Sequence, residues 1–180
     1  GWLFRAKPDE FKKIPGSPVV YWVNHSLIEA FSTSTELSES GVCASGIQTS
    51  DNEKYLRRWF EVDYSQLNFD LAGVELISVA KFCWIPHHKG GGFRRWYGNN
   101  DWVLKWSLDE LNMDPKVQLK NMEYQCKESV TWSHTSSSSF SVRYGEPSFS
   151  FNVEGPIYID SKDNLVALAF LASSVALYMM

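Results

Sequence analysis

The sequence predicts an α+β fold, with a mixed, mostly antiparallel sheet and flanking helices. Two observations lead to this prediction: short segments of alternating apolar and polar residues in the middle of the chain, and apolar runs of helical character near both ends. Turn residues separate most of these segments, and no internal repeat is visible. At 180 residues, 44% of them hydrophobic, the chain is long enough to bury a core.

The first helix is predicted within VVYWVNHSLIEAF, residues 19–31, because Val23, Leu27 and Phe31 fall on one side at helical spacing. Turn residues, Pro15-Gly16 and Pro18, mark the preceding stretch as a leading segment. The stretch 32–41, STSTELSESG, is predicted to be a polar connector.

Strands are predicted for most of the middle of the chain. The expected strand segments are residues 42–49, 55–62, 75–85, 101–106, a hairpin over 130–144 with a serine-rich tip, and further strands in 148–159. Pro86 is expected to end the third of these, and residues 108–125 are expected to be helical on both sides of Pro115.

The final run, LVALAFLASSVALYMM, predicts a buried helix that residues between Asp160 and Asp163 cap. A span of a bilayer needs roughly twenty apolar residues, and Ser173 and Ser174 interrupt this shorter run. We therefore expect no membrane partner. Because the apolar run ends the chain, we also expect the C-terminus to be truncated within this helix.

Charge and cysteine content narrow the class of protein. The net charge of -4 argues against a free-standing nucleic-acid binder, although a local basic patch acts within an acidic surface. The three scattered cysteines do not suggest a disulfide framework, which favours a reducing, cytoplasmic location.

The run KFCWIPHHKGGGFRRWYGNNDWVLKW, from Lys81 to Trp106, is the main candidate for a binding site. It combines cations, a glycine run, aromatic rings and amides, the groups that grip a polyanion and read bases. The candidate binding residues here are Lys89, Gly90, Gly91, Arg94, Arg95, Trp96, Tyr97, Asn99 and Asn100, with Lys105 as a further cation of the run. In the turn GIQTSDN, Gln48 and Asn52 are added as weaker candidates.

Each candidate has a structural alternative. Gly90 to Gly92 would supply backbone N–H groups to a phosphate or form a flexible loop between two strands. Trp96 and Tyr97 would stack on bases, but the core is the commoner place for such rings. Turn chemistry is favoured for Asn99 and Asn100, and helix capping for the polar groups of GIQTSDN. Arg57 and Arg58 are adjacent on a predicted strand, so only one of them would lie on a binding face.

No catalytic residue and no metal ligand is predicted. His87 and His88 lie near Cys83, but adjacent histidines rarely hold one ion without a further pair at regular spacing. No Gly-x-Ser-x-Gly motif for a nucleophile is present.

Several segments together resemble the C-terminal part of a large bacterial N6-adenine DNA methyltransferase. The family is the PglX-type enzyme of BREX phage-defence systems, with relatives among fused restriction–modification enzymes. The similar segments are IPGSPVVYWV, GIQTSDNEKYLRRWFEV, HKGGGFRRWYGNNDWVLKW, ESVTWSHTSSSSFSVRY and LVALAFLASS. Ser50 departs from the glycine that the family usually has, and His87-His88 from its aromatic–Asn pair.

The resemblance implies a division of labour. Such enzymes need a glycine-containing loop for S-adenosylmethionine and an Asn/Asp-Pro-Pro-Tyr motif, and no Pro-Pro dipeptide occurs here. The resemblance therefore implies a segment, 1–24, leading from a catalytic domain, and a target-recognition domain, 25–180. Double-stranded DNA and the catalytic domain of the same parent chain would be its partners. This fragment would bind no cofactor, whereas the parent would use S-adenosylmethionine.

Three other functions remain open. A protein-interaction module of a phage-defence complex would use the aromatic residues to dock a partner. The eight tryptophans alone suggest a carbohydrate-binding module, and His87, His88 and Cys83 suggest a metal-dependent hydrolase.

Overall fold

The computed structural model describes residues 5–14, 16–79 and 81–179, and it divides the chain into two compact units, Gly1–Ser40 and Gly41–Met180. This division does not test the predicted functional boundary after residue 24, which stays a prediction. Pro15, where a turn is expected, lies outside the described residues. Ser17 N donates a hydrogen bond to Ile14 O at 2.9 Å.

The first unit is helical. Its helices are α1 (Pro8–Phe11), α2 (His25–Thr33) and α3 (Leu37–Ser40). The predicted helix within residues 19–31 is confirmed in type, but it begins only at His25. Asn24 sets that start, because its side-chain oxygen accepts a hydrogen bond from Leu27 N at 2.8 Å. The expected polar connector contains the short helix α3.

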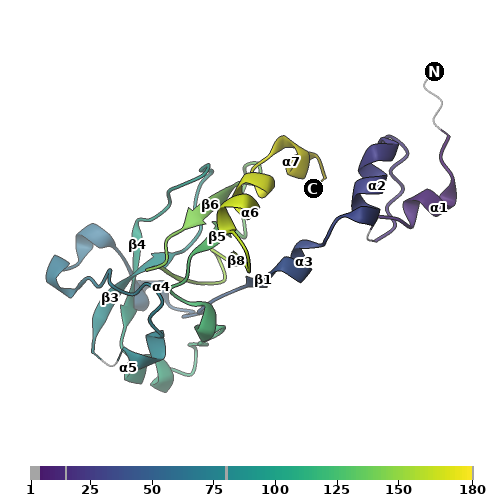
Figure 1. The fold of residues 1–180 in the computed structure, drawn as a ribbon. Coiled ribbons are helices and arrows are strands. Elements are labelled where there is room, and N and C mark those ends of the chain that lie inside the picture. The colour runs from purple at the N-terminus through teal and green to yellow at the C-terminus, as the bar shows by residue number, and fades with distance from the viewer. Residues whose placement is uncertain (1–4, 15, 80, 180) are drawn as a thin grey trace. The chain divides into compact units, whose positions relative to one another are not determined.

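The second unit contains two four-stranded sheets (Figure 1). The first sheet is antiparallel throughout, in the order β1 (Gly41–Ala44), β8 (Ile157–Asp160), β5 (Ser129–Trp132) and β6 (Val142–Gly145). The second has the order β2 (Leu56–Arg58), β4 (Trp102–Trp106), β3 (Cys83–His88) and β7 (Ser150–Phe151). Its β3–β7 pair is parallel and its other pairs are antiparallel. The predicted α+β class is confirmed.

Short helices accompany these sheets. They are α4 (Asn52–Tyr55), α5 (Leu108–Met113), α6 (Asn164–Leu171) and α7 (Ser174–Met179), with single 3₁₀ turns at Trp59–Glu61, Tyr64–Gln66, Leu76–Ser78 and Met122–Tyr124. The second sheet shares a core with α4 and α5 around Trp106, which is fully buried and donates its indole N–H to Val79 O at 3.0 Å. In the first sheet, Val130 and Val142 pack against α6.

Several expected boundaries are wrong. Pro86 does not end β3, which continues to His88. The neighbouring strand β7 joins only at His87, and Ser150 Oγ donates to the Pro86 carbonyl at 3.0 Å. Residues 76–78 form a 3₁₀ turn, so the predicted strand over 75–85 is reduced to its last part. The chain beyond Pro115 forms no α-helix before β5 in the part that the structure describes; only the 3₁₀ turn at Met122–Tyr124 occurs there.

Other element predictions hold. The hairpin over residues 130–144 is confirmed by the antiparallel pair β5–β6. Asp163 caps the last helical segment by accepting from Leu165 N and Val166 N, as expected. That segment is broken between α6 and α7 and buries only one face of α6, with Leu165 and Val166 exposed. Among the described residues, no helix is both long enough and apolar enough to cross a membrane.

Candidate nucleic-acid interface

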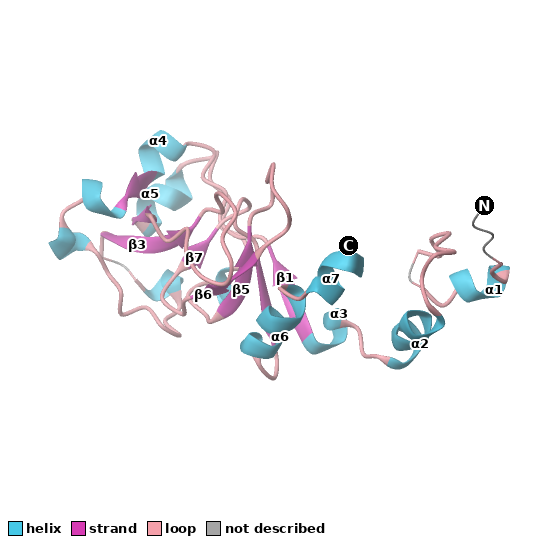
Figure 2. Ribbon diagram, turned by 90° about the horizontal axis from the view of Figure 1, so that it is seen from above, coloured by secondary structure: helices cyan, strands magenta, loops and turns pink. Residues whose placement is uncertain are grey.

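The predicted glycine loop, residues 89–100, joins β3 to β4 and is fastened to the edge strand of the other sheet. Trp96 pairs with Arg143 of β6 in a parallel bridge, and Tyr144 N donates to Trp96 O at 2.7 Å. The Tyr97 hydroxyl donates to the Glu146 carboxylate at 3.0 Å. The loop thus closes over the junction of the two sheets, where Figure 2 shows β3 and β7 close to β5 and β6.

The glycines of this loop meet different demands. Gly90 has φ +78°, and a Cβ there would lie 2.5 Å from the backbone oxygen of Glu154. Gly91 has φ +131°, and its carbonyl accepts from Ser133 Oγ at 2.8 Å. A Cβ at Gly92 would meet nothing within 4 Å. Within the run Gly90–Gly92, only the first two glycines are required by the backbone, and they seat the loop on neighbouring chain.

Asn99 and Asn100 have separate roles. Asn99 adopts φ +63° and donates its amide to Gly92 O at 2.8 Å, so the turn interpretation is confirmed for this residue. Asn100 buries both polar atoms of its amide, and neither has a hydrogen bond of normal geometry to a described residue, although the amide lies near the Tyr97 hydroxyl. The pKa of Tyr97 is raised, first by burial and then by Glu146, while the nearby Asn100 amide lowers it.

Arg94 and Arg95 lie on the exposed part of the loop. Arg94 Nη1 donates to the carbonyl of Phe93 at 3.0 Å, and the Arg95 guanidinium lies 5.4 Å from the centre of the Phe93 ring. Neither arginine takes part in an ion pair within the described ranges. Trp96 and Tyr97 are 60% and 56% exposed, so the expectation that they belong to the core is wrong. Two cations and two rings therefore face solvent together.

Lys89 and Arg58 both lie over the ring of Trp102. The Arg58 guanidinium is 4.1 Å from the centre of the Trp102 ring, and Lys89 Nζ is 5.6 Å from it. Arg58 also forms an ion pair with Asp101 at 3.1 Å. Arg57 turns away, because its Nη1 donates to the backbone oxygens of Glu53 and Leu56. Of the two adjacent arginines, only Arg58 lies next to a residue of the loop. Its strand pairs opposite Trp102, whose ring Lys89 also approaches.

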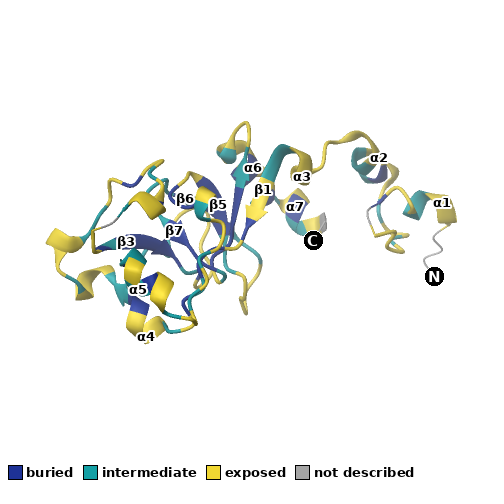
Figure 3. Cartoon of the chain, turned by 90° about the horizontal axis from the view of Figure 1, so that it is seen from below, coloured by how far each residue is buried: buried dark blue, intermediate teal, exposed yellow. Residues whose placement is uncertain are grey.

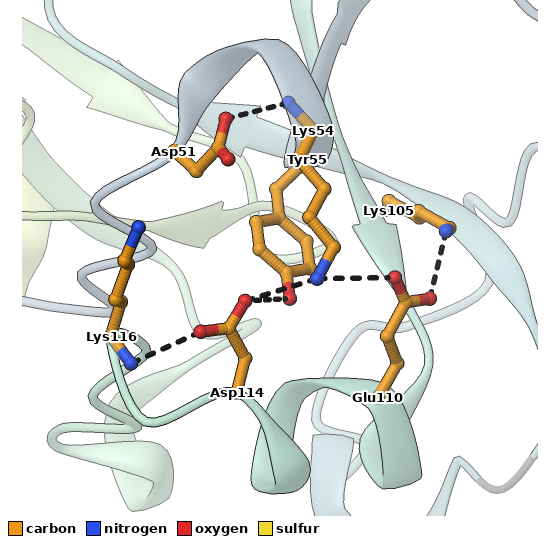
Figure 4. Close-up of polar contacts among 7 residues, drawn as sticks. All are labelled: Asp51, Lys54, Tyr55, Lys105, Glu110, Asp114 and Lys116. Atoms are coloured by element: carbon orange, nitrogen blue, oxygen red, sulfur yellow. Dashed lines mark hydrogen bonds and ion pairs between the residues drawn. The ribbon is translucent and has the colours of Figure 1, made fainter.

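Lys105 does not belong to this surface. Its Nζ pairs with Glu110 at 2.7 Å, within a network that also holds Lys54, Tyr55 and Asp114 (Figure 4). Lys54 Nζ lies 3.0 Å from Asp114, and the Tyr55 hydroxyl donates to the same carboxylate at 2.9 Å. The hydrogen bond from Lys54 contributes most to lowering the pKa of Asp114 to about 2. These bonds join α4 to α5, and both lysines of the network are paired with a carboxylate.

Gln48 and Asn52 also lie elsewhere. The backbone of Gln48 pairs with that of Gln118 through hydrogen bonds of 3.0 and 2.8 Å. Asn52 is the first residue of α4, and the capping group is Asp51, which accepts from Lys54 N at 3.0 Å. No contact found in the described part of the chain joins either side chain to the loop. Their role in binding stays a prediction without structural support.

Beneath the loop lies a buried polar layer. On β5 and β6, the residues that alternate with Val130 and Val142 face away from α6, and Ser129, Thr131 and Arg143 are all buried there. Figure 3 shows β3, β5, β6 and β7 in the dark blue of buried residues. Arg143 is 1% exposed, and sequence patterns gave no sign of it beyond an arginine between two apolar-type strand positions.

The adjacent histidines are both buried, and because they follow one another on β3 their rings lie on opposite faces of it. His87 Nδ1 lies 2.7 Å from Ser150 Oγ, and the His88 ring stacks on Phe149 with 4.5 Å between centres. Burial lowers the pKa of both to about 3, aided by His88 and Lys89 for His87 and by Arg143 for His88. Both rings are therefore neutral. No group of three or more metal-binding side chains occurs among the residues the structure describes, and all three cysteines are free thiols.

Comparison with known proteins finds one class of enzyme to which the chain is similar. No family model matches it. Its similarity is to adenine-specific methyltransferases, and the resemblance predicted from the sequence is confirmed.

The particular relatives include PglX of Lacticaseibacillus casei (strain Zhang), 34% identical over 185 residues, and BrxX of Escherichia coli O9:H4 (strain HS), 32% identical over 167 residues. These matches cover 96% and 91% of this chain but 15% and 13% of the respective relatives. The chain thus spans about one seventh of their length.

Proposed function

We propose that this chain is the target-recognition part of a longer adenine-specific DNA methyltransferase that uses S-adenosylmethionine. It would read duplex DNA for a catalytic domain in the rest of the protein, in the cytoplasm. The similarity to adenine-specific methyltransferases supports the class, and the small share of their length supports a part that works with others. The chain also lacks the Pro-Pro dipeptide of the adenine-binding motif.

The observation that carries the recognition role is the fastened loop 89–100. It holds Arg94, Arg95, Trp96 and Tyr97 in solvent, with no acidic partner for either arginine in the described ranges. Exposed guanidinium groups bind phosphates or guanine edges, and exposed rings stack on bases. A loop fixed at both sheets presents these groups without a large ordering cost on binding.

The acidic net charge does not conflict with this role. A recognition domain that contributes one basic surface leaves part of the electrostatic attraction to the rest of the protein. Base contacts then select the site, and they help to offset the few kcal/mol that flipping an adenine costs.

The test is the double substitution Arg94→Ala and Arg95→Ala in the longer protein, followed by sequencing of modified adenines. We expect site-specific methylation to be lost while S-adenosylmethionine binding is retained. The matched control is Lys116→Ala with Lys120→Ala, which removes two exposed charges outside the loop. Normal methylation in the arginine double mutant would overturn the role of the loop.

A second function, docking of a partner protein, is favoured by another surface. Trp59, Phe60, Tyr64 and Phe69 are 49%, 66%, 73% and 46% exposed, in two ring pairs. Large exposed rings of this kind are enriched at protein interfaces. Capture of a partner that is lost in Phe60→Ser with Tyr64→Ser, while methylation stays site-specific, would assign this surface to docking.

A further inference from the structure

Buried polar atoms without a partner are concentrated at one place in the described part of the molecule. They are His88 Nε2, Asn100 Nδ2 and Oδ1, and Arg143 Nε and Nη1. All three residues belong to the glycine loop or to the strands that flank and underlie it. Folded proteins rarely leave such groups unpaired, because each one retains its desolvation cost. Their concentration beneath a single loop points to a ligand that pairs them.

Arg143 carries the largest cost, because a guanidinium keeps its charge when it is buried. Its side chain makes one long hydrogen bond, from Nη2 to Ser133 Oγ at 3.4 Å. None of the ion pairs among the described residues includes it. The charge therefore needs an acceptor that the described residues do not provide.

The interactions that Arg143 makes within the described residues involve no acid: Nη2 donates to Ser133, and its charge acts on the neutral His88 ring. The His88 ring lies close to β6 here, since a Cβ at Gly145, two residues beyond Arg143, would be 3.3 Å from His88 Nε2. The covering loop adds Lys89, Arg94 and Arg95. The neighbouring acid Glu146 already accepts the Tyr97 hydroxyl. Charge complementarity therefore selects an anion.

We propose that Arg143, His88 and Ser133 form the floor of a phosphate-binding site that loop 89–100 covers. The identification of that phosphate as part of a DNA backbone rests on the proposed function. The phosphate itself is inferred only from the unpaired guanidinium and its cationic surroundings. Arg143 would then anchor the backbone below the loop, while Arg94 and Arg95 contact it from above.

Access to this floor requires the loop to shift. The contact that must open is the 2.8 Å hydrogen bond from Ser133 Oγ to Gly91 O, after which Ser133 and Arg143 donate to the same phosphate. Glycines with positive φ, Gly90, Gly91 and Gly98, lie near both ends of the loop and permit this movement.

The first measurement is the thermal unfolding of the 180-residue chain with inorganic phosphate, compared with chloride at equal ionic strength. We expect the midpoint to rise by about 3–6 °C when phosphate is at ten times its Kd. Arg143→Met should show no such rise, because it replaces the guanidinium by an apolar side chain. Without phosphate, its midpoint should equal or exceed that of the wild type, since replacing a buried charge by a packed apolar group is often neutral or stabilising.

The matched control is Arg57→Met. Arg57 donates to two backbone oxygens, so its loss should lower the midpoint and leave the phosphate effect unchanged. A phosphate effect of equal size in Arg143→Met, or no effect in the wild type, would overturn the site. A large loss of stability in Arg143→Met would also overturn it, because a purely structural arginine behaves in that way.

A measurement on the wild type does not depend on any variant folding. Titration with phosphate should shift the NMR signal of a slowly exchanging arginine Nε–H group, and an unchanged spectrum contradicts the site.

Experiments with duplex DNA test the proposed function separately from the phosphate site. If phosphate acts through Arg143 but the parent protein methylates without Arg94 and Arg95, the proposed function fails and the phosphate site stands. If phosphate does not act through Arg143 but methylation depends on Arg94 and Arg95, the proposed function stands and only the phosphate site at Arg143 is rejected.

Discussion

Two clusters of charged side chains in residues 41–180 differ in whether their cations are paired with acids. Between α4 and α5, Lys54 and Lys105 are paired with Glu110 and Asp114 at 2.7 to 3.6 Å. Around the glycine loop, Arg94, Arg95 and Arg143 have no acidic partner in the described ranges. The first cluster holds two helices together, whereas the second retains positive charge.

The difference shows why the cations of one sequence run do not share one role. Lys105 and Arg95 lie in the same 26-residue run, from Lys81 to Trp106, yet Lys105 points to a helix that supplies a carboxylate. A paired charge contributes modestly to stability, and an unpaired one remains available to a ligand. The following predictions test this separation, from the largest expected effect to the smallest.

The buried histidines of the loop region should dominate the pH dependence of stability. Their pKa values near 3 lie below the ordinary 6.5, so the unfolded chain takes up protons below pH 6.5 while the folded chain does not. Stability is therefore complete above pH 6.5 and falls with decreasing pH by about 1.4 kcal/mol per pH unit for each histidine. Urea unfolding at pH 7, 6 and 5 measures this slope.

The substitution His88→Phe should remove about half of that slope and keep the stack on Phe149. The Asp114 carboxylate between α4 and α5 affects stability in a lower pH range. Because its pKa is lowered from 3.8 to about 2, its contribution to stability is lost only below about pH 4. An unchanged slope between pH 7 and 5 in His88→Phe would contradict the assignment.

The unpaired arginines should control the salt dependence of DNA binding by the longer protein. Replacing Arg94 and Arg95 by alanine should weaken binding at least about 30-fold if each contact is worth about 1 kcal/mol. The slope of log K against log salt should also fall by about 1.8 if both contact phosphates. Fluorescence anisotropy with a labelled duplex measures both. Lys54→Ala, which removes a paired cation, should leave the salt slope unchanged.

The glycine run should tolerate change at one end only. Gly90→Ala should cost about 1–2 kcal/mol for its positive φ alone, and the contact with Glu154 O adds to this. Gly92→Ala should alter the free energy of unfolding by less than about 0.5 kcal/mol. Urea unfolding of the two variants compares them directly, and equal costs would show that the loop is not seated on residue 154.

The same tyrosine substitution should have unequal effects in the two regions. Tyr55→Phe removes a buried ring's hydrogen bond to Asp114 and should cost about 1 kcal/mol. Tyr97→Phe removes a bond at an exposed ring and should cost less than about 0.5 kcal/mol, while speeding amide exchange across residues 94–98. A larger loss of stability at Tyr97 would reverse the comparison.

Some of this organisation was predictable from local patterns. Alternation identified the β5–β6 hairpin and the strand over 101–106, and Asp163 marked the start of α6. The run around Arg94 and Arg95 stood out because the kinds of residue, rather than their positions in space, identify a polyanion site. Pro86 was misjudged because its effect depends on whether a neighbouring strand needs its N–H, which the local sequence does not show.

The sequence by itself determined the α+β class, the basic aromatic loop and the resemblance to adenine-specific methyltransferases, since these depend on residue type and order. Only the tertiary structure decided which charges are compensated. Glu110 pairs with Lys105 through helix packing, and Arg143 is buried where Trp96 of the glycine loop pairs with β6. Pairing and burial are set by distances between residues far apart in the chain, so no local pattern contains them.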